Sequence, residues 1–177
     1  MIEWLDYTVL DMFLDIRNPV LTPIMKLFTI MGEGGAVWIV TAVLLLLFRQ
    51  TRKVGITVAL ALIFCLLAGN VLLKNVIARP RPCWRHQEIE MLIAEPKDFS
   101  FPSGHTMAAF AAAISIFLWD RRWGLAAVLG AVIIALSRMY FYVHYPTDVL
   151  AGAVFGVVMG ILSVGVVHAF ENRRKQC

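Results

Sequence analysis

Residues 54–78 read VGITVALALIFCLLAGNVLLKNVIA, and the one charged side chain in this run is Lys74. About 20 apolar residues in a helix are enough to cross the hydrocarbon core of a bilayer, so the run predicts a transmembrane helix. The composition agrees, because 60% of the 177 residues are hydrophobic and only 16% are charged. Soluble domains contain about 45–50% apolar and about 25% charged residues. We therefore expect an integral membrane protein.

Four further apolar segments have lengths suited to membrane helices, although the first of them is short. They cover residues 34–48, 103–119, 123–142 and 147–170. The sequence contains no internal repeat and no low-complexity tract. These features predict an all-α fold, a polytopic membrane helix bundle of about five transmembrane helices over residues 34–170, within a single domain over residues 1–177.

Residues 1–33 have a different pattern from these segments. Apolar residues such as Leu10 and Phe13 recur at helical spacing among acidic ones, which is typical of an amphipathic helix lying in the membrane interface. A second short helix is expected to begin near Asn18-Pro19 and to end near Gly32. The first residues are acidic where a signal peptide would be basic, so no signal peptide is expected.

The charges of the loops predict an orientation in the membrane. Residues 49–53, 120–122 and 171–177 share one side and carry eight cations and two acids, whereas the other side carries eight cations and ten acids. Cytoplasmic loops are enriched in Lys and Arg. We therefore expect a multi-pass protein of the cell membrane, with the N-terminus outside and the tail 171–177 in the cytoplasm.

Polar and ionisable residues gather in three places, all at helix ends that this topology puts on the outer face. Such residues are costly beside a bilayer and are typically functional. The three groups are Lys74-x6-Arg81-Pro82, Pro102-Ser103-Gly104-His105 and Ser137-Arg138-x5-His144-x3-Asp148.

The group around Ser103 is suited to binding an anion. A capping Ser103 before an apolar helix presents free backbone N–H groups and the positive end of the helix dipole. Gly104 allows close approach to the backbone, and His105 could give a proton to an oxygen of the anion. The alternative is an ordinary helix cap with an interfacial histidine.

The group around His144 is suited to nucleophilic or base chemistry. Asp148 is expected in the first turn of a helix that starts at Pro146, where it could accept the ring N–H of His144 and leave the other nitrogen free to react. The planar fork of Arg138 suits phosphate or carboxylate oxygens. The alternative is a structural ion pair between Arg138 and Asp148, with His144 as a bystander.

Lys74 is followed by two arginines that alternate with prolines. The chain is therefore expected to be extended there, with Arg79 and Arg81 on opposite sides, so that only one of them faces the same site as Lys74. The alternative for Lys74 is a side chain that reaches up to the membrane surface.

Taken together, the three groups resemble the motifs of the type 2 phosphatidic acid phosphatase (PAP2) superfamily, the lipid phosphate phosphatases, in order and in spacing. The resemblance implies that His144 attacks phosphorus with Asp148 orienting it, and that His105 protonates the leaving oxygen. It also implies phosphate-binding roles for a further set: Lys74, Arg81, Ser103, Gly104 and Arg138. Arg79 and Arg85 fall outside the motif and are expected to line the mouth or to meet lipid headgroups.

The resemblance implies a metal-independent enzyme without a cofactor, acting on a lipid phosphate or diphosphate at the outer leaflet. Among such enzymes the chain looks most like undecaprenyl-diphosphate phosphatases. Phosphatidylglycerophosphate or phosphatidate phosphatases are the alternative, and a non-catalytic lipid-phosphate binding or transport protein is a third. The expected partners are this lipid and the bilayer, not a nucleic acid, and the oligomeric state stays open.

The loop 83–98 and the cysteines allow two smaller predictions. The loop is interpreted as a rim or lid of the site, or else as a solvated loop. Its acidic residues are Glu88, Glu90, Glu95 and Asp98. The cysteines lie in an apolar run, a loop and a tail, so they predict no disulfide framework and are interpreted as incidental. They are Cys65, Cys83 and Cys177.

Overall fold

The computed structural model describes residues 2–176, which form helices and connecting loops without any strand, so the interpretation of Cys177 lies outside it. The α-helices are α1 (Ile2–Asp15), α2 (Leu21–Met31), α3 (Ala36–Leu47), α4 (Arg52–Cys65), α5 (Lys74–Ile77), α6 (Pro82–Arg85), α7 (Gly104–Trp119), α8 (Arg121–Tyr140) and α9 (Pro146–Gln176). A 3-10 turn, η1 (Glu33–Gly35), precedes α3, and a π-helical stretch, η2 (Leu66–Leu73), joins α4 to α5. The predicted all-α fold is confirmed.

Three stretches of the described chain are individually long and apolar enough to cross a membrane: Arg52–Arg85, Arg121–Tyr140 and Pro146–Arg173. A fourth crossing forms if α2 is counted together with the helical stretch Glu33–Leu47, which meets it at a bend of 49°. Helix α7 is apolar but has only 16 residues. These lengths fit a multi-pass membrane bundle.

The division expected near residue 33 coincides with a bend of 49° between α2 and the helical stretch Glu33–Leu47. Helix α2 packs against α8 and continues through η1 into α3. The bend occurs at Gly34 and Gly35, whose φ angles of 57° and 72° lie in the left-handed region that suits glycine. Helix α2 is therefore part of the bundle wall, which sequence periodicity alone did not reveal.

Helix α7 lies at the centre of the bundle, in contact with α4, α8 and α9. Small residues let α9 approach it closely: a Cβ atom at Gly156 would lie 2.5 Å from the Met107 carbonyl oxygen, and one at Gly152 would lie 2.7 Å from that of Ser103. This close packing brings the start of α9 beside the start of α7, where the Ser103 N–H donates to the Asp148 carbonyl oxygen at 3.1 Å.

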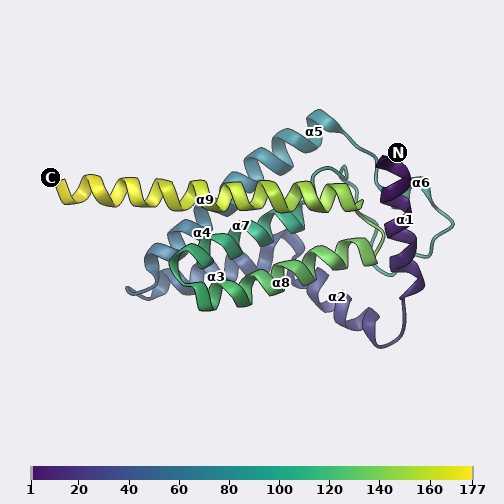
Figure 1. Cartoon of the computed structure of the whole chain (residues 1–177), viewed down its shortest axis with the longest axis horizontal. Helices are drawn as coiled ribbons and strands as arrows, with labels where there is room; N and C mark the ends of the chain where they lie inside the picture. Colours follow the sequence, from purple (N-terminus) through teal and green to yellow (C-terminus); the bar gives the residue numbers. More distant parts are fainter. Residues whose placement is uncertain (1, 177) are drawn as a thin grey trace.

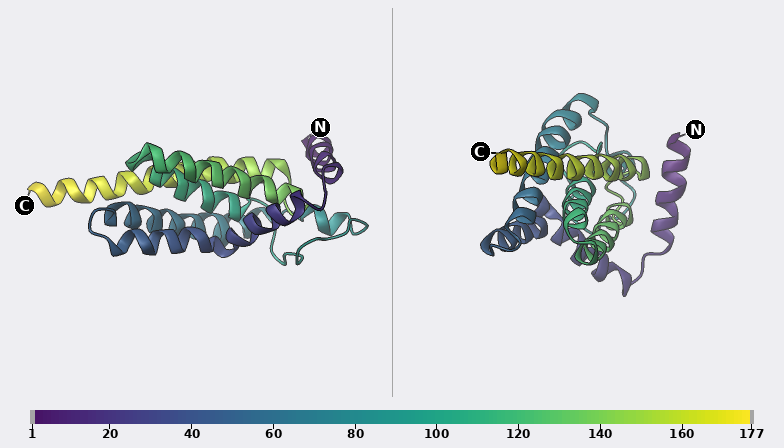
Figure 2. Two further views of the ribbon diagram at one scale, coloured as in Figure 1. Left: turned by 90° about the horizontal axis from the view of Figure 1, so that it is seen from below. Right: turned by 60° about the vertical axis from the view of Figure 1, so that its left-hand side comes forward.

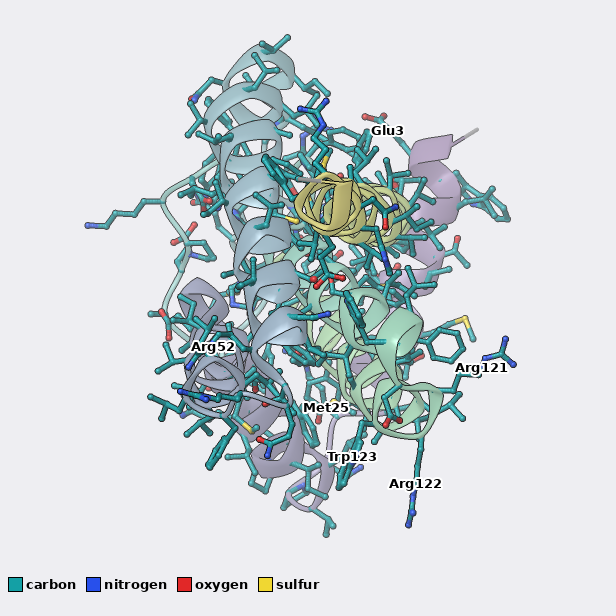
Figure 3. All side chains as sticks on the ribbon, turned by 90° about the vertical axis from the view of Figure 1, so that its left-hand side faces the viewer. Glu3, Met25, Arg52, Arg121, Arg122 and Trp123 are labelled. Atoms are coloured by element: carbon teal, nitrogen blue, oxygen red, sulfur yellow. The ribbon has the colours of Figure 1, made fainter. Side chains whose placement is uncertain are left out.

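Helix α1 lies across the end of the bundle at which α9 begins, and the C-terminus lies at the opposite end (Figures 1 and 2). Leu10 packs into a buried cluster with Tyr142 and Tyr145, while Trp4 and Met12 are exposed. Figure 3 looks along the bundle from the C-terminal end and shows the side chains of Arg121 and Arg122 pointing away from the helices. An exposed apolar face on a crosswise helix is the arrangement expected of an interfacial helix.

Candidate active site

A cavity of about 610 Å³ lies at the α1 end of the bundle. The residues of the three motifs that line it are Lys74, Arg81, His105, Arg138 and His144. Gly104 lines an adjoining cavity, and Ser103 and Asp148 are fully buried behind these walls. The structure therefore brings together side chains from α5, the loop after it, α7, α8 and the turn before α9.

His144 is buried, and its two ring nitrogens have different partners. Nε2 lies 3.1 Å from Nη1 of Arg81, which can only donate, so Nε2 is the acceptor and the ring proton is on Nδ1. Burial lowers the pKa of His144 well below its usual value, and the charges of Arg81 and Arg138 lower it further. The imidazole is therefore neutral, with its reactive lone pair on the side of Arg81.

Asp148 does not accept the expected direct hydrogen bond from His144. Its Oδ2 lies 3.7 Å from His144 Nδ1, and the Ser100 hydroxyl lies between them, 3.4 Å from Nδ1 and hydrogen-bonded to Oδ2. Oδ2 also accepts the Tyr145 N–H at 3.0 Å, as a residue at the third helical position does in a capping box. Ser100 belongs to none of the motifs, and no local pattern in the sequence identified it.

Arg79 and Arg81 do point in different directions, as their alternation with prolines predicted. Arg81 lines the cavity, whereas Arg79 donates to Asp148 Oδ1 at 2.6 Å and to Asp6 Oδ2 at 2.7 Å. The expectation that Arg79 lines the mouth or meets lipid headgroups was wrong, because two buried carboxylates hold its guanidinium. Arg85 is at the surface, paired with Glu3 at 3.2 Å.

Asp98 connects the two cations of the first motif. Its carboxylate pairs with Lys74 and lies 2.6 Å from Nη2 of Arg81. Burial opposes ionisation of this carboxyl, but Lys74 and Arg81 outweigh burial and lower its pKa to about 2. Lys74 is buried, with 7% of its surface exposed, so it does not reach up to the membrane surface.

The loop before Asp98 forms part of the cavity wall, which favours the interpretation as a rim over that as a freely solvated loop. Two of its four acids, Glu95 and Asp98, line the cavity. Glu88 instead pairs with His86 at 2.7 Å, and the Glu90 carbonyl oxygen accepts a hydrogen bond from Arg17.

Arg138 has one donor, Nε, that the described residues leave without a hydrogen-bond partner. Its Nη1 donates to the Thr29 hydroxyl of α2, but its buried Nε has no hydrogen-bond partner among the described residues. A buried N–H without a partner is costly. The Arg138 side chain also lines the cavity, so its guanidinium charge acts on whatever the cavity binds.

The turn before α7 differs in detail from the prediction. Ser103 occupies the N-cap position, but its hydroxyl bonds to Thr106 Oγ1 at 2.9 Å and does not cap the helix. The expected role of Ser103 as a side-chain cap was therefore wrong. A Cβ at Gly104 would lie 2.8 Å from Asn70 Oδ1, so a larger residue there would displace the end of the Asn70 side chain. His105 lines both cavities.

Within residues 2–176, no group of three or more His, Cys, Asp or Glu side chains could hold a metal ion. Cys65 and Cys83 are buried free thiols on different elements. The charged residues that line the cationic cavity are the cations Lys26, Lys74, Arg81 and Arg138 and the acids Glu33, Glu95 and Asp98.

Two of the relatives that are similar to this chain in sequence are undecaprenyl-diphosphatases. The undecaprenyl-diphosphatase of Sulfolobus acidocaldarius is 36% identical over 131 residues, which cover 73% of this chain but only 63% of that protein. The undecaprenyl-diphosphatase BcrC of Bacillus subtilis is 33% identical over 150 residues, which cover 82% of this chain and 75% of that protein.

The solved structures that are similar in fold include two crystal structures. That of Aquifex aeolicus LpxE matches with a TM-score of 0.80 at 27% identity, over 91% of this chain and 95% of the other. That of the first transmembrane PAP2 type phosphatidylglycerolphosphate phosphatase from Bacillus subtilis matches with a TM-score of 0.74 at 27% identity, over 97% of this chain and 86% of the other. Residues 53–172 match the PAP2 superfamily, a range that includes all three motifs, and the chain therefore belongs to that superfamily.

Proposed function

We propose that this protein is a membrane-embedded lipid phosphatase that removes phosphate from a lipid phosphate or diphosphate headgroup at the outer membrane face. The substrate that we favour is undecaprenyl diphosphate, converted to undecaprenyl phosphate and inorganic phosphate. The names of two relatives support this choice. The distribution of loop charges supports the outer face.

One observation carries the proposal: the cationic cavity meets an apolar one. The second cavity, of about 570 Å³, lies between α3 and α4 and shares Lys74, Asp98 and His105 with the first. Four apolar side chains that line it are about half exposed on the surface of the bundle: Ile39, Val43, Ile63 and Leu66. A phosphate among the cations and a hydrocarbon chain between these helices would belong to the same ligand.

The proposed reaction has two steps. Nε2 of His144 attacks phosphorus while the bond to the leaving oxygen breaks, and His105 gives that oxygen a proton. Water then attacks the phosphohistidine, His105 takes the proton, and the bond between phosphorus and nitrogen breaks. In both steps Lys74, Arg81 and Arg138 would stabilise the charge on the phosphoryl oxygens.

A phosphatidylglycerophosphate phosphatase is the second candidate. The observation that favours it is the similarity in fold to the Bacillus subtilis enzyme that acts on this lipid. The cationic cavity would bind either headgroup, so the choice depends on the hydrocarbon chain.

The test is phosphate release by the purified protein from undecaprenyl diphosphate, phosphatidylglycerophosphate, phosphatidate and a soluble phosphate ester. We expect release from a lipid in the presence of EDTA, with inhibition by vanadate, which resembles the five-coordinate state of phosphorus. Binding of all four without release would support the binding or transport protein instead. Activity that EDTA abolishes and Mg²⁺ restores would contradict the metal-independent reaction.

A further inference from the structure

Arg79 is a partly buried cation, with 21% of its side chain exposed, for which the proposed reaction has no role. It lies two residues before Arg81, yet its guanidinium points toward α1 and α9. Nη1 donates to Asp148 Oδ1 at 2.6 Å and to the Thr147 hydroxyl at 2.8 Å, and Nη2 donates to Asp6 Oδ2 at 2.7 Å. One side chain therefore connects the carboxylate behind His144 to the N-terminal helix.

Asp6 of α1 caps the helix on which Asp148 lies. Its Oδ1 accepts the Thr147 N–H at 3.0 Å, and its Oδ2 accepts the Thr147 hydroxyl at 2.7 Å. The first turn of α9 has no local side-chain cap of the usual kind, since Tyr145 precedes it and Pro146 has no N–H. A residue distant in sequence therefore does the work of an N-cap.

The two carboxylates of this cluster, Asp6 and Asp148, depend on the Arg79 guanidinium as their charged partner. Asp6 and Asp148 are 1% and 0% exposed, and a buried carboxylate is costly unless it is paired. Arg79 pairs with both, and its guanidinium lies 3.9 Å from the centre of the Tyr145 ring. With Asp6 and Tyr145 fixing it, Arg79 restrains Oδ1 of Asp148, while Oδ2 is left for Ser100 and the Tyr145 N–H.

We propose that Arg79 and Asp6 are positioning residues: they fix Asp148, and through Ser100 they fix the ring of His144 for attack on phosphorus. Helix α1 would then be a working part of the active site as well as an interfacial helix. This inference rests on the proposed phosphatase function. Neither Arg79 nor Asp6 lines the cavity, so their effect should fall on turnover and not on binding.

The first measurement is steady-state kinetics of phosphate release. We expect Arg79→Gln to lower kcat about 30- to 100-fold and Asp6→Asn about 5- to 20-fold, each with KM within about twofold of the unsubstituted protein. Arg85→Gln is the matched control, because Arg85 also pairs with α1, through Glu3, but at the exposed surface. Its kcat should stay within about twofold.

A double-mutant cycle separates positioning from general destabilisation. If Arg79 acts through Asp148, adding Arg79→Gln to protein that already carries Asp148→Asn should lower kcat by at most about a further threefold. A merely structural role would multiply the two losses. If Arg79→Gln does not fold, as judged by its melting temperature and gel filtration, the same cycle with Asp6→Asn decides.

Two results would overturn the inference: kcat of the Arg79 and Asp6 variants within twofold of the unsubstituted protein, or losses that multiply with that of Asp148→Asn. A different result, no phosphate release by the unsubstituted protein, would refute the proposed function and this inference with it. The two failures are therefore distinguishable.

Discussion

Oδ1 of Asp98 lies 2.6 Å from Nη2 of Arg81. An arginine that is expected to bind phosphate is therefore already paired with a carboxylate of the protein. Lys74 is paired with the same side chain. A substrate must displace this carboxylate or approach against its charge. We expect Asp98→Asn to lower KM for the lipid phosphate by about 3- to 10-fold, because the removed charge both competes with and repels the substrate. A higher KM would show instead that Asp98 helps to build the site.

The same ion pairs predict a pH dependence of stability. Because the folded-state pKa of Asp98 is lowered to about 2, its contribution is fully present above the ordinary Asp pKa of about 3.9 and is lost as the pH falls toward 2. The melting temperature of the detergent-solubilised protein should therefore fall between pH 4 and 2 more steeply than that of Asp98→Asn. Parallel curves for the two proteins would contradict the lowered pKa.

The environment of His144 predicts the acid limb of the rate profile. Burial and the neighbouring arginines lower its pKa, so the imidazole stays neutral as the pH falls through the ordinary value of about 6.5. The pH dependence of kcat/KM reports the pKa of this group in the free enzyme. We expect its acid limb, measured with a substrate whose own ionisation is known, below pH 6.5. An acid limb above that value would mean that a different environment surrounds His144 in solution.

Replacements along the series of His144, Asp148 and Ser100 should have graded effects. His144→Ala should lower kcat by several orders of magnitude, because the covalent route is lost. Asp148→Asn, which misorients the His144 ring, should lower kcat by about 10²- to 10³-fold, and Ser100→Ala should lower kcat by about tenfold. Single-turnover phosphate release measures all three. Equal losses for Asp148→Asn and His144→Ala would contradict an orienting role for Asp148.

The two arginines of the first motif should have different kinetic effects. Arg81→Ala removes a cation of the cavity, so we expect a higher KM together with a lower kcat. Arg79→Ala should leave KM nearly unchanged and should reduce kcat/KM less than Arg81→Ala does. The reverse order in kcat/KM would mean that Arg79 and not Arg81 is the phosphate ligand.

Much of the site could be predicted from local patterns in the sequence. The apolar runs predicted the helices. The alternating direction of successive helices predicted that the helix ends carrying Lys74, His105 and His144 would lie at the same end of the bundle. The alternation with prolines also predicted that Arg79 and Arg81 would diverge. These inferences need only the periodicity of helices and the order of crossings.

The remaining contacts depend on where loops and helices dock, which no periodicity encodes. Ser100 reaches His144 because the loop before α7 packs against the start of α9, and Asp6 reaches Arg79 because α1 lies across the same start of α9. The continuity of α2 with α3 likewise depends on the bend at Gly34. An acidic residue such as Asp6 in an amphipathic helix looks, in sequence, like any other on its polar face.

The two cavities adjoin at Lys74 and His105, and this has a consequence for how the lipid enters and the products leave. A lipid held between α3 and α4 could reach the site by moving sideways within its leaflet, and after hydrolysis it could leave in the same way. Its hydrocarbon tail would never need to enter water. Inorganic phosphate alone would then leave through the cationic cavity. The lipid product would thus be released into the bilayer and the phosphate into water.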